Sequence, residues 1–356
     1  MNNIEKLQAV LPDDACALIT SDVNRRYFTG MKSSAGTAVI FKDKAYLLID
    51  FRYIEKAEET AKGCEVVLMK QYIKQLNEII AKHKPAQLMV ESETMTVSEL
   101  ERLKKGIEGD LKINSSDDLS RAINKIRAVK TADELEKMKR AQEIADNAFK
   151  FVLDNFIDEG VTEAELARAL DFNMLSHGAE AVSFDTIVLS GANTSLPHGV
   201  PSDKKIQKGE FILMDFGSVY EGYHSDMTRT FCLGQPTAEM QEIYSIVLEA
   251  QQKCLDFVKA GVVCKELDAC ARDFIASKGY GENFGHGLGH SVGMEIHESP
   301  AANTRDETVL EENMIMTIEP GIYLPKKFGI RIEDCIAVQK NGHINFASSP
   351  KNLLTI

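Results

Sequence analysis

The sequence predicts an α+β protein in two parts: a larger C-terminal domain with helices over one face of a mixed or antiparallel sheet, and a smaller N-terminal α/β domain. Three observations indicate this. The 356 residues exceed one typical domain and fall short of three. The first ~120 residues alternate strand and helix patterns. Beyond them, a pair of helices followed by strands occurs twice, which implies internal pseudo-symmetry with a site between the halves.

Apolar runs and an amphipathic segment define the N-terminal part. Residues 15–20 and 37–49 have strand character, and residues 71–83 carry the spacing of an amphipathic helix. A polar stretch at 114–118 follows, shortly before a helix start signal. We therefore expect an N-terminal domain over residues 1–122 and a C-terminal domain over residues 123–356.

Helix signals organise the C-terminal part. Thr131 with Glu134, and Thr162 with Glu165, form the Thr-x-x-Glu pattern of a capping box, and Gly279 suits a helix C-terminus. Strands are expected up to about residue 232 and again over about 283–338. The four expected helices cover residues 131–157, 162–177, 237–259 and 265–278.

Composition excludes several classes of protein. The 44% apolar and 27% charged residues are typical of a globular chain, and no apolar run reaches the ~20 residues that cross a bilayer. The first residues lack a basic region followed by an apolar stretch, so we expect a cytoplasmic protein. A net charge of −13 disfavours nucleic acid and anionic membranes as partners. Seven scattered cysteines without a CxxC pair favour neither a disulfide framework nor structural zinc.

Two aspartates lie in a predicted hairpin over residues 211–233. A tight turn at 221–222 or 220–221 would pair Asp215 with Asp226, or with its same-face neighbour Thr228. The alternative is a half-exposed hairpin with ordinary surface acids. Asp215 follows four apolar residues, however, where an unpaired carboxylate is costly to bury, so a functional role is favoured.

Two glutamates lie inside apolar strand patterns near the C-terminus. Glu319 follows the run at 314–318, and Glu333 lies in the segment 328–338 with Arg331 on the same face. Two ordinary explanations stay open. Arg331 and Glu333 would form a simple salt bridge on the sheet, and Glu319 would merely end a strand.

Three of the eight histidines fall in the glycine-rich segment 284–300, namely His286, His290 and His297. The glycines argue against a helical His-x-x-x-His pair, and the segment lacks the glutamate of HExxH. A lone histidine is usually structural, but three among glycines favour a site. Nothing fits a phosphate-binding loop.

Together these segments supply a ligand set for hard metal ions. Carboxylate oxygens suit manganese, magnesium or calcium, and an imidazole widens the choice to cobalt, iron or zinc. Four acids close together repel one another unless cations lie between them, which suggests two metal ions. The candidate ligands are Asp215, Asp226, His290, Glu319 and Glu333.

Five motifs in order resemble the Xaa-Pro peptidases of the pita-bread metallopeptidase family: LPHG (196–199), DFGSVYEGYHSDMTRT (215–230), HGLGHSVGMEIHE (286–298), TIEPGIY (317–323) and RIED (331–334). The resemblance covers roughly residues 125–356 strongly. Residues 1–120 resemble a creatinase-type N-terminal domain more loosely, mainly through NRRYFTG (24–30). The resemblance of the C-terminal part implies a pita-bread catalytic domain, in which helices cover a curved, pseudo-symmetric sheet.

The resemblance also implies residue roles. The five candidate ligands would hold two divalent ions, first of all Mn²⁺ with Co²⁺ or Zn²⁺ as alternatives, and Asp226 and Glu333 would contact both ions. Glu319 would also shuttle protons, and His198 and His297 would stabilise the oxyanion or position the substrate. His286 and Arg331 would orient ligands or substrate.

The implied activity is hydrolysis of the Xaa-Pro bond in dipeptides by a metal-bridging hydroxide, as in prolidases. The alternatives are an Xaa-Pro aminopeptidase (aminopeptidase P) that acts on longer peptides, and a non-catalytic pita-bread binding protein. A dipeptidase needs a cation for the free carboxylate, for which we consider Arg305; the competing explanation is a solvated arginine beside Asp306. The family further suggests a homodimer.

Overall fold

The computed structural model describes residues 1–356. The chain folds into two compact units, residues 1–127 and 128–356. The boundary expected between residues 122 and 123 lies inside helix α6 (Asp118–Ala128). None of the helices combines the length and the apolar character that a bilayer crossing requires.

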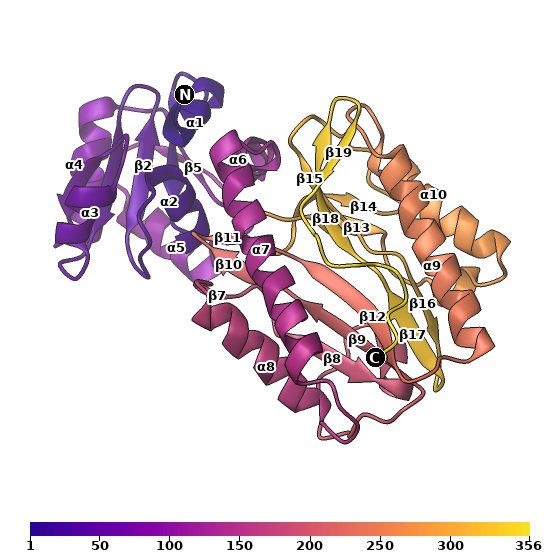
Figure 1. The fold of residues 1–356 in the computed structure, drawn as a ribbon. Helices are drawn as coiled ribbons and strands as arrows, with labels where there is room; N and C mark the ends of the chain where they lie inside the picture. Colours follow the sequence, from indigo (N-terminus) through magenta and orange to yellow (C-terminus); the bar gives the residue numbers. More distant parts are fainter. The chain divides into compact units, whose positions relative to one another are not determined.

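The first unit is an α/β domain built on one mixed sheet with the strand order β4-β3-β2-β1-β5-β6 (Figure 1). Strand β1 pairs antiparallel with β2 and parallel with β5. The apolar run at 37–49 forms two antiparallel strands. The elements are α1 (Asn3–Val10), β1 (Ala15–Ile19), α2 (Asp22–Thr29), β2 (Thr37–Phe41), β3 (Ala45–Ile49), α3 (Ile54–Thr60), β4 (Glu65–Leu68), α4 (Tyr72–His83), β5 (Gln87–Val90), α5 (Val97–Gly106) and β6 (Lys112–Asn114).

Four long helices of the second unit begin where the sequence signals predict. Thr131 and Thr162 each accept a hydrogen bond from the backbone of the glutamate three residues on, and that glutamate returns one, so both capping boxes form. Gly279 adopts a positive φ of 89° just after the last of these helices. The helices are α7 (Ala132–Asn155), α8 (Glu163–Ser176), α9 (Ala238–Phe257) and α10 (Cys264–Ser277).

Strands of the second unit follow each helix pair, and all their pairings are antiparallel. The first set is β7 (Ala181–Val182), β8 (Ile187–Ser190), β9 (Glu210–Phe216), β10 (Ser218–Tyr220), β11 (Tyr223–His224) and β12 (Met227–Leu233). The second set is β13 (Gly289–Ser291), β14 (Glu298–Ala302), β15 (Ile315–Ile318), β16 (Gly321–Leu324), β17 (Phe328–Arg331), β18 (Asp334–Gln339) and β19 (Gly342–Asn345).

Each helix pair has its own hydrophobic core against its strands. Phe149 of α7 packs on Phe216 of β9 and Phe231 of β12, with ring centroids 6.0 Å apart in both pairs. In the other half, residues of α9 and α10 pack against β15 to β18, with Ile318 and Ile336 fully buried among them. The predicted order of two helices and then strands, repeated once, is confirmed (Figure 1). The strands lie between the two helix pairs.

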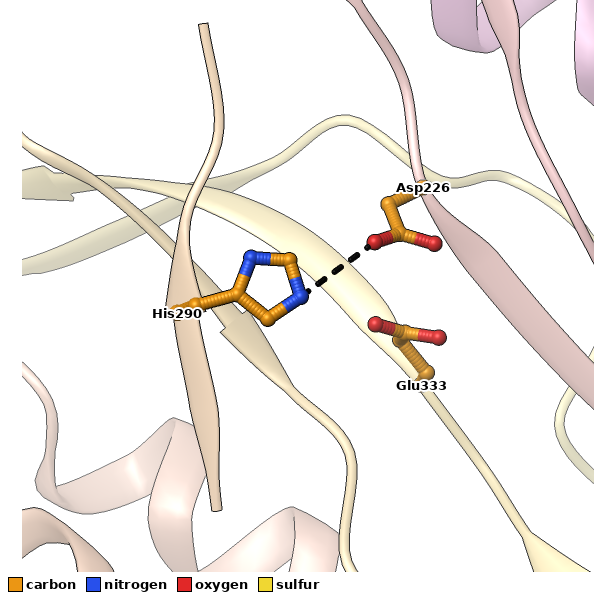
Figure 2. A group of neighbouring side chains, drawn as sticks. All are labelled: Asp226, His290 and Glu333. Atoms are coloured by element: carbon orange, nitrogen blue, oxygen red, sulfur yellow. Dashed lines mark ion pairs between the residues drawn. The ribbon is translucent and has the colours of Figure 1, made fainter. Parts of the chain in front are cut away.

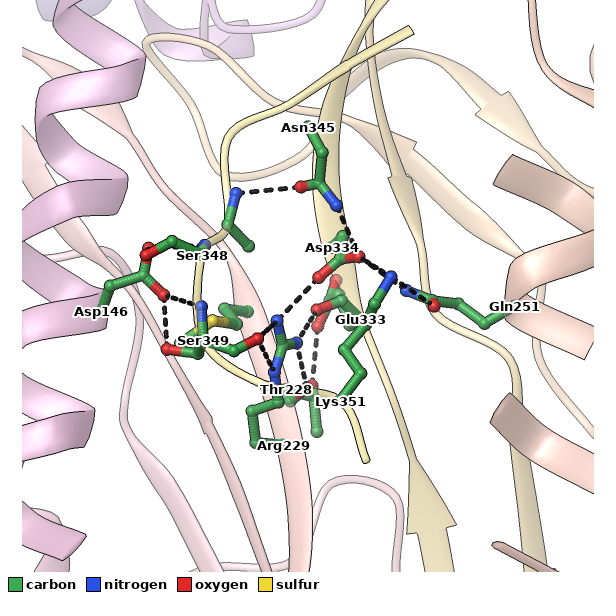
Figure 3. Close-up of polar contacts among 12 residues, drawn as sticks. Asp146, Thr228, Arg229, Gln251, Glu333, Asp334, Asn345, Ser348, Ser349 and Lys351 are labelled. Atoms are coloured by element: carbon green, nitrogen blue, oxygen red, sulfur yellow. Dashed lines mark hydrogen bonds and ion pairs between the residues drawn. The ribbon is translucent and has the colours of Figure 1, made fainter. Parts of the chain in front are cut away.

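The C-terminal segment that contains Ser348 and Ser349 connects these halves through hydrogen bonds to buried charged groups (Figure 3). Asp146 of α7 accepts hydrogen bonds from the backbone and hydroxyl groups of Ser348 and Ser349. Arg229 of β12 donates to the Ser349 carbonyl oxygen at 2.9 Å and to a carboxylate oxygen of Asp334 at 2.8 Å. Because both charges of the Arg229–Asp334 pair are fully buried, they depend on these partners. The network fixes β12 and β18 at the ends nearest the candidate site.

Candidate metal centre

The hairpin that carries the two aspartates forms through a tight turn at Glu221–Gly222. Both turn residues have positive φ, 48° and 87°, the conformation that twisted two-residue hairpins require. Asp215 in β9 pairs directly with Thr228 in β12, the second of the two registers considered from the sequence. Asp226 lies immediately before β12, so it projects near Asp215 from the start of the neighbouring strand.

The two glutamates lie where strands end rather than in their middles. Glu319 follows the last residue of β15, and its backbone N–H donates to the Leu288 carbonyl oxygen at 2.9 Å. Glu333 lies between β17 and β18, and its N–H donates to the Thr228 carbonyl oxygen at 3.1 Å. These bonds tie each glutamate to a segment that carries another candidate ligand.

His290 in β13 has a defined tautomer. Its Nδ1 lies 3.1 Å from the Ser291 carbonyl oxygen, which can only accept a hydrogen bond, so Nδ1 carries the proton. The lone pair of Nε2 is therefore free and faces two carboxylates, with Asp226 and Glu319 each 3.6 Å away. A histidine that donates through one ring nitrogen and presents the other is arranged as a metal ligand.

Asp226, His290 and Glu333 form the tightest group, with one ligand atom from each within 4.8 Å of the others (Figure 2). In Figure 2 the imidazole points between the two carboxylates, although the three residues come from three separate segments of the chain. Glu319 and Asp215 lie in the wall of the same cavity, whose volume is about 580 Å³. All five candidate ligands thus meet at one cavity.

Burial and mutual repulsion make these carboxyls hard to ionise without a cation. Burial, followed by the charges of Asp215 and Glu319, raises the pKa of Asp226 well above its ordinary value. Burial, then Asp226 and Glu319, does the same to the pKa of Glu333. Burial raises the pKa of Glu319 to about 8, although the Arg331 guanidinium opposes this effect.

The residues present fit divalent metal ions. Asp215 Oδ1 is buried without a hydrogen-bond partner, although an unpaired buried carboxylate oxygen is costly. Four carboxylates and one unprotonated imidazole nitrogen supply the oxygen-rich donor set that such ions take in proteins.

A buried guanidinium holds Asp215 in place. Arg331 donates to Asp215 Oδ2 at 2.6 Å, to Thr228 Oγ1 at 3.0 Å and to the Tyr323 hydroxyl at 2.8 Å. The salt bridge from Arg331 is thus made to Asp215 and not to Glu333, the pairing considered from the sequence. Glu333 instead accepts a hydrogen bond from Thr228 Oγ1 at 2.6 Å.

His286 joins the same network from the opposite side. Its Nδ1 donates to the Gly287 carbonyl oxygen at 2.8 Å, so its Nε2 accepts the hydrogen bond from the Tyr323 hydroxyl at 3.0 Å. Burial lowers the pKa of His286 to about 4 and raises the pKa of Tyr323 to about 12, so both stay neutral at physiological pH.

The remaining predicted residues divide into two groups. His198 and His297 line the cavity, and the His297 ring lies 4.5 Å from the His290 ring, measured between centroids. Arg305 is exposed and does not line the cavity, although its backbone N–H donates to the side chain of Asn303, which does.

Sequence reasoning assigned no role to several residues that shape the site. Tyr323, Thr228 and Thr317 are among them, and Thr317 donates to Glu319 Oε1 at 3.3 Å and accepts from the His290 N–H at 3.0 Å. For Thr228 the available signal was its predicted position opposite Asp215. Phe184 and Asp185 also line the cavity and carried no motif that would have marked them.

Comparison with known proteins adds independent information. Residues 136–340 match metallopeptidase family M24, and residues 4–129 match the creatinase/prolidase N-terminal domain. The Xaa-Pro dipeptidase of Pyrococcus furiosus is 38% identical over 354 residues, which cover 99% of this chain and 99% of that protein.

Solved structures agree over nearly the whole chain. An Xaa-Pro dipeptidase from Bacillus anthracis has a TM-score of 0.94 and 41% identity, covering 99% of both chains. An X-Pro aminopeptidase from Thermotoga maritima has a TM-score of 0.92 and 38% identity, covering 98% of this chain and 99% of that one. The α+β fold and the two-domain organisation predicted from the sequence are confirmed.

The raised carboxyl pKa values predict a pH-dependent response to metal. A carboxyl whose pKa is raised in the folded state binds more protons there than the same carboxyl does in the unfolded chain. The free energy of unfolding of the metal-free protein therefore falls as pH rises from about 4.5 towards about 8. Metal binding removes that penalty because ligands bind deprotonated. We expect Mn²⁺ to raise the melting temperature more at pH 8 than at pH 5, measured by scanning calorimetry. Equal shifts at both pH values would contradict this expectation.

Thr228 should influence metal affinity without being a ligand. Replacing it in Thr228→Val keeps the volume but removes the hydroxyl that donates to Glu333, and losing such an outer partner typically weakens metal binding by about 10- to 100-fold. Isothermal titration with Mn²⁺ measures the change. Ser291→Ala is the control, because the buried Ser291 hydroxyl has no hydrogen-bond partner. Equal affinities for both variants would refute the role of Thr228.

Proposed function

We propose that this chain, which belongs to metallopeptidase family M24, hydrolyses the peptide bond between an N-terminal residue and proline in dipeptides. The observation that carries the proposal is the convergence of Asp226, His290 and Glu333 at one cavity, with Asp215 and Glu319 in the same wall. Relatives named Xaa-Pro dipeptidase, similar over almost the full chain, support the same substrate class.

The proposed metal ligands are the five residues of this cavity, Asp215, Asp226, His290, Glu319 and Glu333. Manganese is the proposed ion, because carboxylate oxygens predominate, and cobalt or zinc also tolerate such a set. When bound, divalent ions supply Lewis-acid chemistry, polarising a carbonyl and making water a better nucleophile near neutral pH.

Glu319 is the proposed proton carrier. Its position in the cavity wall, with the side chain 17% exposed, suits a carboxyl that takes up and releases a proton beside the attacking water. The Thr317 hydroxyl donates to Oε1 of Glu319 and keeps the carboxyl facing the cavity. Glu319 would accept a proton from the attacking water and return it to the proline nitrogen, which must be protonated to leave.

Imidazole groups at the cavity wall would serve the developing oxyanion. The N–H groups of His198 and His297 can donate to an oxygen that becomes negative as the carbonyl is attacked. His286 and Arg331 would act less directly, because their hydrogen bonds run to Tyr323 and Asp215 and hold that ligand in position. Apolar wall residues such as Phe184 and Ile187 offer a surface for the proline ring.

One observation favours a second candidate, an Xaa-Pro aminopeptidase. Arg331 is the only Lys or Arg that lines the cavity, and it forms a salt bridge with Asp215. The cavity wall therefore has no unpaired Lys or Arg that could bind the carboxylate of a dipeptide. The aminopeptidase structure of Thermotoga maritima is also closely similar. The named dipeptidases among the relatives nevertheless favour the dipeptide substrate.

Two further features belong to the proposal. The composition and cysteine pattern support a cytoplasmic location, and the family resemblance supports a homodimer. A non-catalytic binding protein is the competing class. That class would have no need for the raised carboxyl pKa values and the partnerless Asp215 oxygen found here.

Substrate length separates the two activities. With Mn²⁺ bound, we expect efficient hydrolysis of Ala-Pro, much slower hydrolysis of Ala-Pro-Gly and none of Ala-Ala, each followed by chromatography of the products. Chelation with EDTA should abolish turnover, and added Mn²⁺ should restore it. Faster cleavage of Ala-Pro-Gly than of Ala-Pro would establish the aminopeptidase instead, and turnover that survives complete metal removal would exclude both.

Arg305 is the proposed anchor for the dipeptide carboxylate, since its loop borders the cavity through Asn303. Arg305→Ala should then raise the KM for Ala-Pro by about 10-fold or more, because a hydrogen bond to a charged group is lost, and leave kcat nearly constant. Arg168→Ala, another exposed arginine outside the cavity, is the matched control. Unchanged kinetics in Arg305→Ala would remove this role and leave Arg305 as a solvated loop residue.

A further inference from the structure

We propose that Asp185 binds the α-ammonium group of the substrate, an inference that rests on the dipeptidase function proposed above. A dipeptide carries a positive charge at its amino end, next to the bond that is cleaved. A cleft that selects free amino termini needs a negative charge placed for that group. Asp185 has the position, the free charge and the rigid support for this role.

Asp185 lies in the wall of the cavity that the five candidate metal ligands also line. It lies in the short connection between β7 and β8, and Phe184 and Ile187 beside it line the same space. Its side chain is exposed, so its carboxylate is open to a ligand. No hydrogen bond or ion pair within the protein engages this carboxylate.

The residues around Asp185 are held firmly. Ser183 is buried, its N–H donates to the Gly217 carbonyl oxygen at 2.9 Å, and its hydroxyl donates to the Ser225 carbonyl oxygen at 2.8 Å. Thr186 is buried as well and donates to Asp171 Oδ1 at 2.5 Å. Since Ser225 directly precedes the ligand Asp226, these bonds fix Asp185 relative to the metal centre. A preorganised charge binds its partner at low entropic cost.

The distribution of charge around the cavity makes Asp185 the carboxylate available to bind the ammonium group. Five carboxylates line the space, and four of them are the proposed metal ligands Asp215, Asp226, Glu319 and Glu333. Two divalent ions would neutralise those four, so they offer an ammonium group no net attraction. Asp185 is the one acid in the wall that neither the metal set nor a neighbouring cation uses.

Replacing the charge tests the inference. Asp185→Asn should raise the KM for Ala-Pro by about 10- to 100-fold, the effect of losing a charge-assisted hydrogen bond. The competitive inhibition constant of propionyl-proline, which has a hydrogen atom in place of the ammonium group, should stay the same. Asp185→Glu keeps the charge and should recover most of the affinity for Ala-Pro. Asp203→Asn, an exposed acid outside the cavity, is the matched control and should leave both constants unchanged.

These measurements distinguish a failure of the proposed dipeptidase function from a failure of the proposed role of Asp185. If the manganese-loaded wild-type protein does not hydrolyse Ala-Pro, the proposed function itself is wrong. If the wild type hydrolyses Ala-Pro and Asp185→Asn has the same KM, the role of Asp185 is overturned while the function stands. If Asp185→Asn weakens Ala-Pro and propionyl-proline equally, Asp185 shapes the cleft and does not recognise the ammonium group, which also overturns the inference.

Discussion

Electrostatic repulsion among buried carboxylates is the constraint on which the catalytic unit depends. Asp226, Glu319 and Glu333 come from three separate strand ends, yet the fold brings them to one cavity where burial alone already raises their pKa values. Such an arrangement costs stability unless protons or cations compensate it. Its presence at a cavity lined by residues of both halves of the unit is the physical reason to regard the protein as a metalloenzyme.

The residues around this centre are arranged as specifically as the proposed ligands. Arg331 pairs with Asp215, Thr228 donates to Glu333, and Tyr323 joins Arg331 to His286. One residue beyond Thr228, Arg229 pairs with Asp334 and binds the C-terminal segment (Figure 3). The strands that present the proposed ligands are thus held in place by a buried network of charged groups. The same bonds position the proposed ligands and stabilise the unit.

Local signals account for the parts that the sequence predicted well. Capping boxes at Thr131 and Thr162 set helix starts through their own hydrogen bonds, and the Glu221–Gly222 turn fixes the hairpin register. The family resemblance, confirmed by the comparisons, extended these signals to the whole fold. The run at 37–49 has the strand character that its apolar residues predict, divided into two strands by a turn at residues 42–44.

Other features depend on contacts between distant segments and could not be read from local pattern. The partner of Arg331 is 116 residues away along the chain, and the nearer Glu333 was the obvious candidate. Tyr323 acquires its role only because β16 and β17 pair and bring it to Arg331 and His286. Asp185 lies in a loop without motif residues, and only the cavity reveals it.

The most direct test of the central claim is the anomalous X-ray scattering of crystals grown with Mn²⁺. We expect strong peaks within coordination distance of Asp226, His290 and Glu333, with Asp215 and Glu319 completing the coordination. Full-occupancy manganese bound elsewhere, or a cavity without anomalous signal at saturating Mn²⁺, would contradict the account.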